Sequence, residues 1–249
     1  MIRIFVNKNN LQSKKLLLSK EDFNHLNVLR IKPSTQIELL VIDQKLLLIK
    51  VLSLNKTVLT FTLISQKALP QQPQPQITLA QCLPKQEKFT DILKKCTELG
   101  VSTFIPVINS RTIPKITTEK SKHKIQRWQK IIKESSEQSK RYYLPNLSPP
   151  MPFTEFLDHA KNKDYNLKIV LWEESSSSQN SLKTILNTAK KSDKILVFVG
   201  PEGGISAAEI EDLLKINFRT ASLGPSILRT ENAGFLACGN IMYELNGSL

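Results

Sequence analysis

The sequence contains few cysteines, few histidines and no long hydrophobic run. Its three cysteines, Cys82, Cys96 and Cys238, are scattered and form no CxxC pair, a pattern that argues against a disulfide framework and against a zinc site. The three histidines join no Asp or Glu at metal-ligand spacing. No apolar run approaches the ~18 residues of a transmembrane helix, and the first ten residues contain no apolar signal core. We therefore expect a cytoplasmic protein that binds neither a metal nor a membrane.

Acidic residues are also scarce in relation to basic ones. The 249 residues include 35 Lys or Arg and 22 Asp or Glu, which gives a formal net charge of +13. The excess is uneven, because residues 1–76 hold 11 basic and 4 acidic residues, residues 111–145 hold 10 and 3, and residues 146–249 carry a net charge of −2. Such a distribution favours an anionic polymer bound away from a more neutral pocket. A generally basic surface with no such partner is the alternative.

The first part of the chain alternates short apolar runs with turns, which is typical of a small β-barrel. The expected strands are Ile2–Val6, Gln36–Ile42, Lys45–Leu52 and Val58–Ile64, with one helix at Lys20–Val28. A segment rich in Pro and Gln follows and can form neither a helix nor a central strand. The sequence therefore predicts a domain of residues 1–70, a linker of residues 71–76 and a second domain of residues 77–249.

In the second domain, apolar strand patterns alternate with helical ones. The expected strands are Ile77–Cys82, Thr103–Ile108, Lys168–Trp172, Ile195–Val199 and Thr220–Leu223, and the expected helices include Glu87–Leu99, Glu119–Gln138 and Ala233–Leu245. This alternation predicts an α/β fold, a mostly parallel sheet with helices on both faces. The last helix is almost wholly apolar, so we expect it to be buried against the sheet or a partner subunit.

Two segments rich in Gly and Pro follow two of the expected strands. The first, Val199–Ser206, reads VGPEGGIS, and the second, Leu223–Ala233, reads LGPSILRTENA. The glycines permit positive φ and close approach of a ligand to the backbone, and a capping box of Ser206 and Glu209 predicts a helix after the first segment. Ligands of open α/β sheets bind beyond the carboxyl ends of the strands. The two segments are therefore a candidate site, with a tight strand-to-helix connection as the alternative.

The side chains of these segments restrict the ligand. The first segment is neither a GxGxxG motif nor a phosphate-binding GxxxxGK[ST] loop, because no Lys follows, and Glu202 within it would repel a phosphate. The loop suits a ligand that is neutral, cationic or hydroxyl-bearing. Arg229 and Glu231 stand beside the apolar last helix, which is costly unless they are paired or used in function. A surface or capping interaction between the two is the alternative.

The two segments together resemble the carboxyl-terminal signature of the SPOUT class of S-adenosylmethionine-dependent RNA methyltransferases. Within this class, the chain resembles the ribosomal RNA small subunit methyltransferase E family, the 16S rRNA (uracil(1498)-N(3))-methyltransferases. Other segments, which precede these two in the chain, match the family in the same order: His25–Arg30, Lys85–Lys88, Lys95–Val101, Arg127–Trp128, Glu137–Arg141 and Leu144–Pro145. One departure is Asn232, where the family pattern has Thr.

The resemblance implies a fold, a reaction and partners. The fold is a SPOUT trefoil-knotted parallel sheet with helices on both faces, plus a small N-terminal PUA-like β-barrel that binds RNA. The reaction is methylation of uridine N3 in 16S ribosomal RNA, within the 30S subunit, by a homodimer that uses S-adenosyl-L-methionine. Two alternatives remain open: a SPOUT methyltransferase that acts on tRNA or another rRNA site, and a non-catalytic RNA-binding ribosome assembly factor.

The resemblance also implies roles for individual residues. Arg229 would stabilise charge on the uracil oxygens, and Glu202 or Glu231 would accept the N3 proton. The expected cofactor-binding residues are Leu171, Glu173, Val199, Gly200, Pro201, Glu202, Gly203, Gly204, Leu223, Gly224, Ile227, Leu228, Arg229, Thr230 and Ala233. The expected RNA contacts are Arg3, Arg30, Arg111, Arg127, Lys140 and Arg141. Tyr142 and Tyr143 are either stacking surfaces for bases or packing residues at a helix end, and His25 is a core or capping residue.

Overall fold

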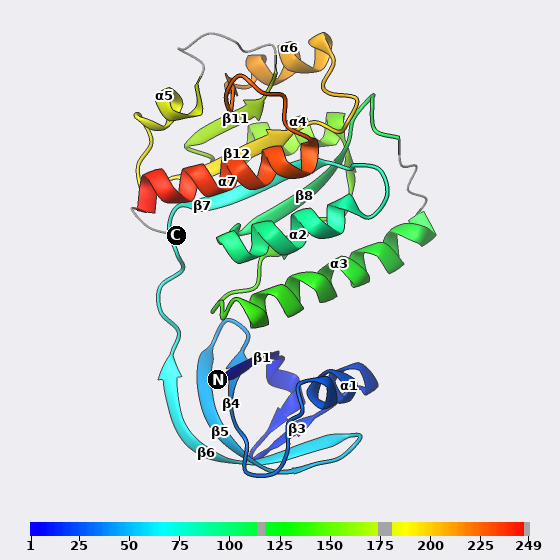
Figure 1. The fold of residues 1–249 in the computed structure, drawn as a ribbon, viewed down its shortest axis with the longest axis vertical. Coiled ribbons are helices and arrows are strands. Elements are labelled where there is room, and N and C mark those ends of the chain that lie inside the picture. The colour runs from blue at the N-terminus through cyan, green and yellow to red at the C-terminus, as the bar shows by residue number, and fades with distance from the viewer. Residues whose placement is uncertain (114–117, 174–180, 247–249) are drawn as a thin grey trace. The chain divides into compact units, whose positions relative to one another are not determined.

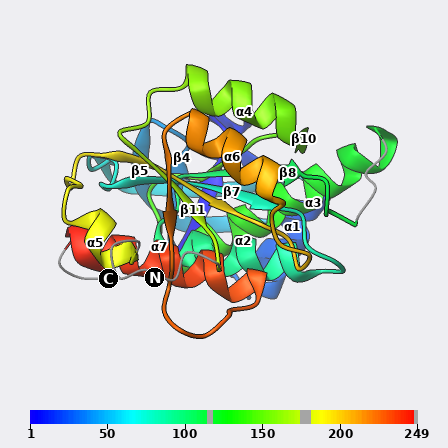
Figure 2. The same ribbon diagram turned by 90° about the horizontal axis from the view of Figure 1, so that it is seen from above.

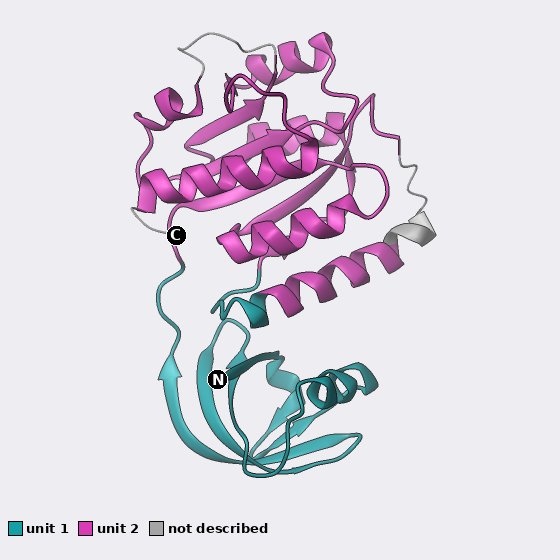
Figure 3. Cartoon of the chain, in the orientation of Figure 1, with its two compact units in different colours: residues 1–72, 136–144 teal, residues 73–135, 145–249 magenta. Residues whose placement is uncertain are grey.

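The computed structural model describes residues 1–113, 118–173 and 181–246, without the side chains of residues 118–121. The chain divides into two compact units, which Figure 3 shows in different colours. Unit 1 consists of residues 1–72 and 136–144, and unit 2 of residues 73–135 and 145–249. The segment 136–144 thus belongs to unit 1, although the sequence analysis assigned it to the second domain.

Unit 1 is built on one six-stranded sheet. Its elements are β1 (Ile2–Val6), the 3-10 helix η1 (Lys8–Asn10), β2 (Leu11–Gln12), β3 (Lys15–Leu17), α1 (Lys20–Val28), β4 (Gln36–Val41), β5 (Lys45–Leu54) and β6 (Val58–Ala68). The strand order is β1-β4-β5-β6-β3-β2, with β1 and β4 parallel and the other pairs antiparallel. Within residues 1–72 no pairing joins the edge strands β1 and β2, so the closed barrel implied by the resemblance is not confirmed. β2 is only two residues long and offers few groups for such a closure.

The alternation of strand side chains builds the core of unit 1 by placing every second residue on the same face. Ile37, Leu39 and Val41 of β4 are all fully buried, together with side chains of β5 and β6. Leu26 of α1 packs against this cluster. The helix begins at the cap residue Ser19, whose hydroxyl accepts the backbone N–H of the third helical residue in a capping box.

Arg3, which the sequence analysis expects to contact RNA, lies inside unit 1. Its side chain is buried, and its Nε donates to Oε2 of Glu38 at 2.9 Å. Its Nη1 donates to the backbone carbonyl oxygens of Lys140 and Arg141, and the Tyr142 ring centroid lies 4.2 Å from the guanidinium carbon. Since these donors have partners within the unit, the role of Arg3 is structural.

The segment 136–144 is held to the rest of unit 1 by further polar contacts. The buried carboxylate of Glu137 accepts the backbone N–H of Phe5 at 2.9 Å and contacts Nε2 of His25 at 2.9 Å. The Tyr143 hydroxyl donates to the carbonyl oxygen of Pro70 at 2.6 Å. These contacts agree with the packing alternative for the two tyrosines and with a non-catalytic His25.

We expect replacement of Arg3 by Met to destabilise the protein by about 2–3 kcal/mol, because Glu38 loses a charged partner and two carbonyl oxygens lose a donor. The measurement is urea unfolding followed by circular dichroism. Lys50→Met is the control, since Lys50 is exposed on β5 and surface changes of this kind stay within about 0.5 kcal/mol. Equal stability of the two variants would contradict the structural role of Arg3.

Unit 2 contains a parallel sheet, as the sequence predicts. Its strands are β7 (Gln76–Cys82), β8 (Thr103–Ile108), β9 (Asn146–Leu147), β10 (Met151–Pro152), β11 (Leu167–Leu171), β12 (Lys194–Val199) and β13 (Phe218–Ala221). Its helices are α2 (Lys88–Leu99), α3 (Thr118–Gln138, which ends in unit 1), α4 (Phe153–Asn162), α5 (Leu182–Leu186), α6 (Ala207–Lys215) and α7 (Thr230–Asn246). The order is β10-β8-β7-β12-β11-β13, with β9 beside β8 and all pairs parallel.

Helices cover both faces of this sheet, which confirms the predicted mixed α/β architecture (Figures 1 and 2). One core contains side chains of α2, α3, α5 and α7, and the other contains side chains of α4 and α6. Strand residues alternate between them, so that Ile77 and Leu79 of β7 face the first core while Ala80 and Cys82 face the second. Within the described residues, no helix is both long and apolar enough to cross a membrane.

Candidate functional site

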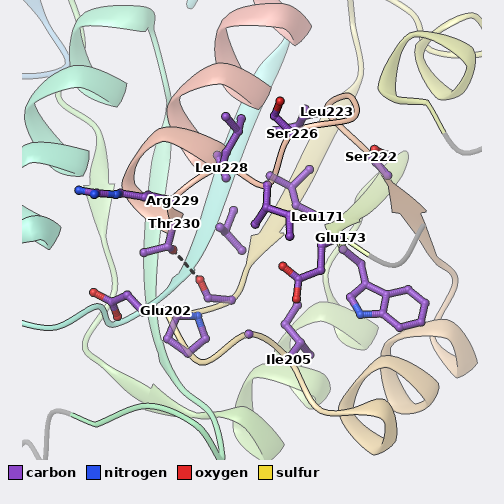
Figure 4. Close-up of a pocket in the computed structure, with 18 of the residues that line it drawn as sticks. Leu171, Glu173, Glu202, Ile205, Ser222, Leu223, Ser226, Leu228, Arg229 and Thr230 are labelled. Atoms are coloured by element: carbon purple, nitrogen blue, oxygen red, sulfur yellow. Dashed lines mark hydrogen bonds between the residues drawn. The ribbon is translucent and has the colours of Figure 1, made fainter. Parts of the chain in front are cut away.

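A cavity of about 400 Å³ lies where three parallel strands of unit 2 end. Leu171 at the end of β11 is paired with Val199 of β12 on one side and with Ala221 of β13 on the other. The three strands therefore stop at the same level, and the loops that follow them surround one space (Figure 4). This is the position at which open α/β sheets bind ligands.

The structure brings all the expected cofactor-binding residues to this cavity. They lie at the ends of β11 and β12, in the loops after β11, β12 and β13, and in the first turn of α7. The lining also contains residues that the sequence analysis omitted: Trp172, Ile205, Ala221, Ser222, Pro225 and Ser226. Ile205, Pro225 and Ser226 stand within the two glycine-containing segments, so the signal for them was present in the motif itself.

The loop after β12 is built around glycines that no larger residue can replace without rearrangement. A Cβ on Gly200 would lie 2.7 Å from Cγ1 of Ile205 and 3.2 Å from the backbone of Gly204. Gly204 has φ +75° and its N–H donates to the carbonyl oxygen of Pro201 at 2.9 Å. The chain thus folds back tightly on itself between Gly200 and Ile205, which opens the space above the strand end.

The helix that follows this loop begins as the sequence predicts. Ser206 and Glu209 form a capping box, with the Ser206 N–H donating to Glu209 and the Glu209 N–H to the serine hydroxyl. The Glu209 carboxylate also accepts the backbone N–H of Ser110 at 2.9 Å. Burial alone would raise the pKa of Glu209, but the hydrogen bonds from Ser110 and Ser206 outweigh it and lower the pKa. An ionised Glu209 therefore anchors the loop after β12 to the loop after β8.

The loop after β13 combines apolar walls with an exposed cation. Gly224 has φ +131°, and its N–H donates to the hydroxyl of Ser222 at 3.3 Å. Leu223 and Leu228 line the cavity together with Leu171, whereas the exposed Arg229 side chain extends away from these leucines (Figure 4). The carbonyl oxygen of Arg229 accepts the N–H groups of residues 232 and 233, which starts α7.

Lys88 of α2 connects Glu202, which lines the cavity, with Glu231, which is not among the lining residues. Its Nζ lies 3.1 Å from Oε1 of Glu202 and 3.4 Å from Oε2 of Glu231, and the backbone N–H of Lys85 donates to both oxygens of Glu202. Burial alone would raise the pKa of Glu202, but hydrogen bonds from its own backbone, Lys88 and Lys85 lower it. The hydrogen bond to Glu202 in turn raises the pKa of Lys88. Lys88 ends the matching segment Lys85–Lys88 but was not predicted as a site residue.

Comparison with known proteins identifies the family. Residues 70–242, more than half of the chain, match the model of the RNA methyltransferase domain. The chain belongs to this family of RNA methyltransferases.

Individual relatives agree with this assignment. The ribosomal RNA small subunit methyltransferase E of Bacillus subtilis is 37% identical over 170 residues, which are 68% of this chain and 66% of that protein. The match to the Synechocystis protein of the same name spans 52% of its length, at 33% identity and over 66% of this chain. The same-named protein of Mesomycoplasma hyopneumoniae is 28% identical over 94% of this chain and 95% of its own.

Solved structures of RNA methyltransferase relatives share the whole fold. The ribosomal RNA small subunit methyltransferase E of Neisseria gonorrhoeae, crystallised with S-adenosyl methionine, has a TM-score of 0.84 at 28% identity and covers 98% of both chains. The putative methyltransferase Lpg2936 of Legionella pneumophila, also in complex with this cofactor, has a TM-score of 0.85 at 28% identity. It covers 97% of this chain and 96% of its own.

The remaining expected RNA contacts lie in different settings. In unit 2, the exposed Arg111 donates to the carbonyl oxygen of Gly203 at 2.9 Å, and the exposed Arg127 forms a two-pronged ion pair with Glu87. In unit 1, Arg30 and Lys140 are exposed, whereas burial lowers the pKa of Arg141 to about 10. Over the described part of the chain, no group of three or more His, Cys, Asp and Glu residues is placed to hold a metal ion.

Replacing Gly200 by Ala tests the tight turn after β12. The new methyl group overlaps Ile205, so we expect the loop to shift, stability to fall by about 1–3 kcal/mol, and any ligand of the cavity to bind more weakly. Gly239→Ala is the matched control, because a Cβ there lies 3.7 Å from its nearest neighbour and alanine favours the helix by about 1 kcal/mol. Thermal unfolding of both variants gives the answer, and a stable Gly200→Ala protein would show that the turn tolerates side chains.

Proposed function

We propose that this chain is an S-adenosylmethionine-dependent methyltransferase that methylates N3 of a uridine in 16S ribosomal RNA of the small subunit. The observation that carries this proposal is the single cavity formed by the two glycine-containing segments and the end of β11. The relatives named ribosomal RNA small subunit methyltransferase E support the substrate, and the two relatives crystallised with S-adenosylmethionine support the cofactor.

The residues around the cavity suit this cofactor. A volume of about 400 Å³ lies within the ~300–1,000 Å³ of small-molecule pockets. Leu171, Leu223 and Leu228 offer apolar walls for the faces of an adenine, and the loop backbones offer N–H and C=O groups for its edge. Glu173 and Glu202 add negative charge, which suits the cationic sulfonium and disfavours a phosphate. When bound, S-adenosylmethionine supplies the methyl group that is transferred.

The acidic and basic side chains then act on the uracil. N3 carries a proton in the neutral base and becomes nucleophilic when this proton leaves. We assign the proton acceptor to Glu231, because Glu202 already accepts from the Lys85 N–H and from Lys88, whereas the described partner of Glu231 is Lys88 alone, at 3.4 Å. Arg229 is exposed beside it and stabilises the charge that develops on the carbonyl oxygens.

RNA recognition is assigned to the basic surfaces. Unit 1 acts as a PUA-like RNA-binding module through Arg30, Lys140 and Arg141, and Arg111 and Arg127 of unit 2 contact the RNA backbone. Binding of this kind weakens steeply with salt. The carboxyl-terminal segment forms the trefoil knot of the SPOUT class, the enzyme works on the 30S subunit in the cytoplasm, and two copies pair through α7. That helix exposes Phe235, Leu236 and Tyr243.

The direct test is methylation of 30S subunits from a strain that lacks this modification, followed by nucleoside analysis. We expect 3-methyluridine as the product, at one site. Arg229→Ala should lower turnover by about 10²–10³-fold, as the loss of one stabilising donor does elsewhere, and still bind S-adenosylmethionine in calorimetry. A wild-type protein that gives no heat of binding with the cofactor would instead favour a non-catalytic RNA-binding factor.

The role of Lys88 is tested by the pH dependence of the reaction. Replacing Lys88 by Met removes a group that holds the pKa of Glu202 low and contacts Glu231, so we expect carboxylate pKa values at the site to rise. The acidic limb of the pH–rate profile should therefore move to higher pH. Lys85→Met is the control, because Lys85 acts on Glu202 through its backbone N–H, which the substitution retains. Identical acidic limbs in Lys88→Met and wild type would exclude these carboxylates as the base.

A further inference from the structure

Gln81 is a fully buried polar residue that stands directly behind the cavity. It lies near the end of β7, where it is paired with Val199 of β12, and it is not among the residues that line the cavity. Its side chain reaches two residues that do line it, Gly200 and Thr230. These belong to different segments, the loop after β12 and the start of α7, so one amide joins the two.

The hydrogen bonds fix which way each group points. The buried Thr230 hydroxyl lies 2.6 Å from the carbonyl oxygen of Gly200, which only accepts, so the hydroxyl donates its single proton there (dashed line in Figure 4). Nε2 of Gln81 lies 2.8 Å from the Thr230 oxygen, 3.4 Å from the Gly200 oxygen and 3.0 Å from the carbonyl oxygen of Cys82. All three oxygens can only accept, because the Thr230 hydroxyl has already donated its proton, so the amide nitrogen and not the amide oxygen must face them.

The other half of the amide has no such partner. Oε1 of Gln81 is buried and makes no hydrogen bond to any described residue. Gly234 of α7 stands against it, and a Cβ at that position would lie 3.2 Å from the oxygen. An unsatisfied buried acceptor costs about 1–3 kcal/mol, so the amide is a poor choice for stability alone. Such an exception calls for an explanation, and a role in the site is one.

We propose that Gln81 is a positioning residue for the methyl donor. It holds the Gly200 carbonyl and the first residue of α7 in one arrangement, so that the two segments present their backbone groups to the cofactor together. This inference rests on the proposed function, since it assumes that S-adenosylmethionine occupies the cavity. Gln81 itself acts only through Gly200 and Thr230.

The first experiment compares cofactor affinity with stability in Gln81→Met, which has a similar length and no donor. We expect S-adenosylmethionine to bind about ten-fold more weakly or worse in calorimetry, a change of ~1.4 kcal/mol. Thr78→Val is the matched control, because Thr78 is buried in the same strand β7 at its other end. We expect Gln81→Met to lose no more stability in urea than this control, which should bind the cofactor like the wild type.

A second variant gives a signature that mere packing does not. In Gln81→Glu, an ionised carboxylate faces three acceptor oxygens, and only the protonated carboxyl can donate to one of them. The affinity of Gln81→Glu relative to wild type should therefore improve as the pH falls. Thr230→Val removes the hydroxyl that accepts the Gln81 amide. Because the two residues act together, we expect the loss of cofactor affinity in the double variant Gln81→Met/Thr230→Val to be smaller than the sum of the losses in the two single variants.

The outcomes separate the inference from the proposed function. A wild-type protein that does not bind S-adenosylmethionine removes both. If the wild type binds and Gln81→Met binds equally well, or if Thr78→Val weakens binding as much, the positioning role is wrong and the proposed function stands. If Gln81→Met does not fold, the pH dependence of Gln81→Glu and the affinity of Thr230→Val decide. A flat ratio across pH with normal binding by Thr230→Val would overturn the inference.

Discussion

The whole site depends on the register of three parallel strands. Leu171 pairs with Val199 and with Ala221, so β11, β12 and β13 end at one level and their loops enclose a single space. Register is set by the burial of alternate side chains on both faces of the sheet. A slip of one residue would turn each strand over and move its loop, so the two cores of unit 2 position the site as directly as the glycines do.

The carboxylates near the cavity are paired with a lysine or with backbone N–H groups. The carboxylates of Glu202 and Glu231 share Lys88, while Glu209 is tied by hydrogen bonds to the loop after β8. Lys88 and the backbone N–H groups of Lys85 and Ser110 are thus matched to carboxylates, which holds these side chains in place. In the sequence, the excess positive charge of the chain lies in residues 1–76 and 111–145.

Local signals predicted the loops that surround the cavity, whereas hydrogen-bond partners distant in sequence could not be predicted. Glycines at tight turns and the capping box of Ser206 and Glu209 are readable because their partners lie a few residues away. The helical spacing of Phe153, Phe156 and Ala160 would also have predicted α4, whereas α5 has only five residues and gives no period. The hydrogen-bond partners of Arg3 and Gln81 could not be predicted, because they lie 137 and 149 residues away in sequence. Hydrophobic alternation likewise predicts a strand and says nothing about whether a sheet closes.

The return of residues 136–144 to unit 1 has a consequence for biosynthesis. When a ribosome has released residues 1–72, the carboxylate that accepts the Phe5 N–H and the carbonyl oxygens that bind Arg3 have not yet been translated. Unit 1 therefore completes its polar core only after about half of the chain has emerged. A gene cut at the segment rich in Pro and Gln would encode the sheet of unit 1 without residues 136–144. The domain boundary that is most visible in the sequence is therefore a poor place to divide the molecule.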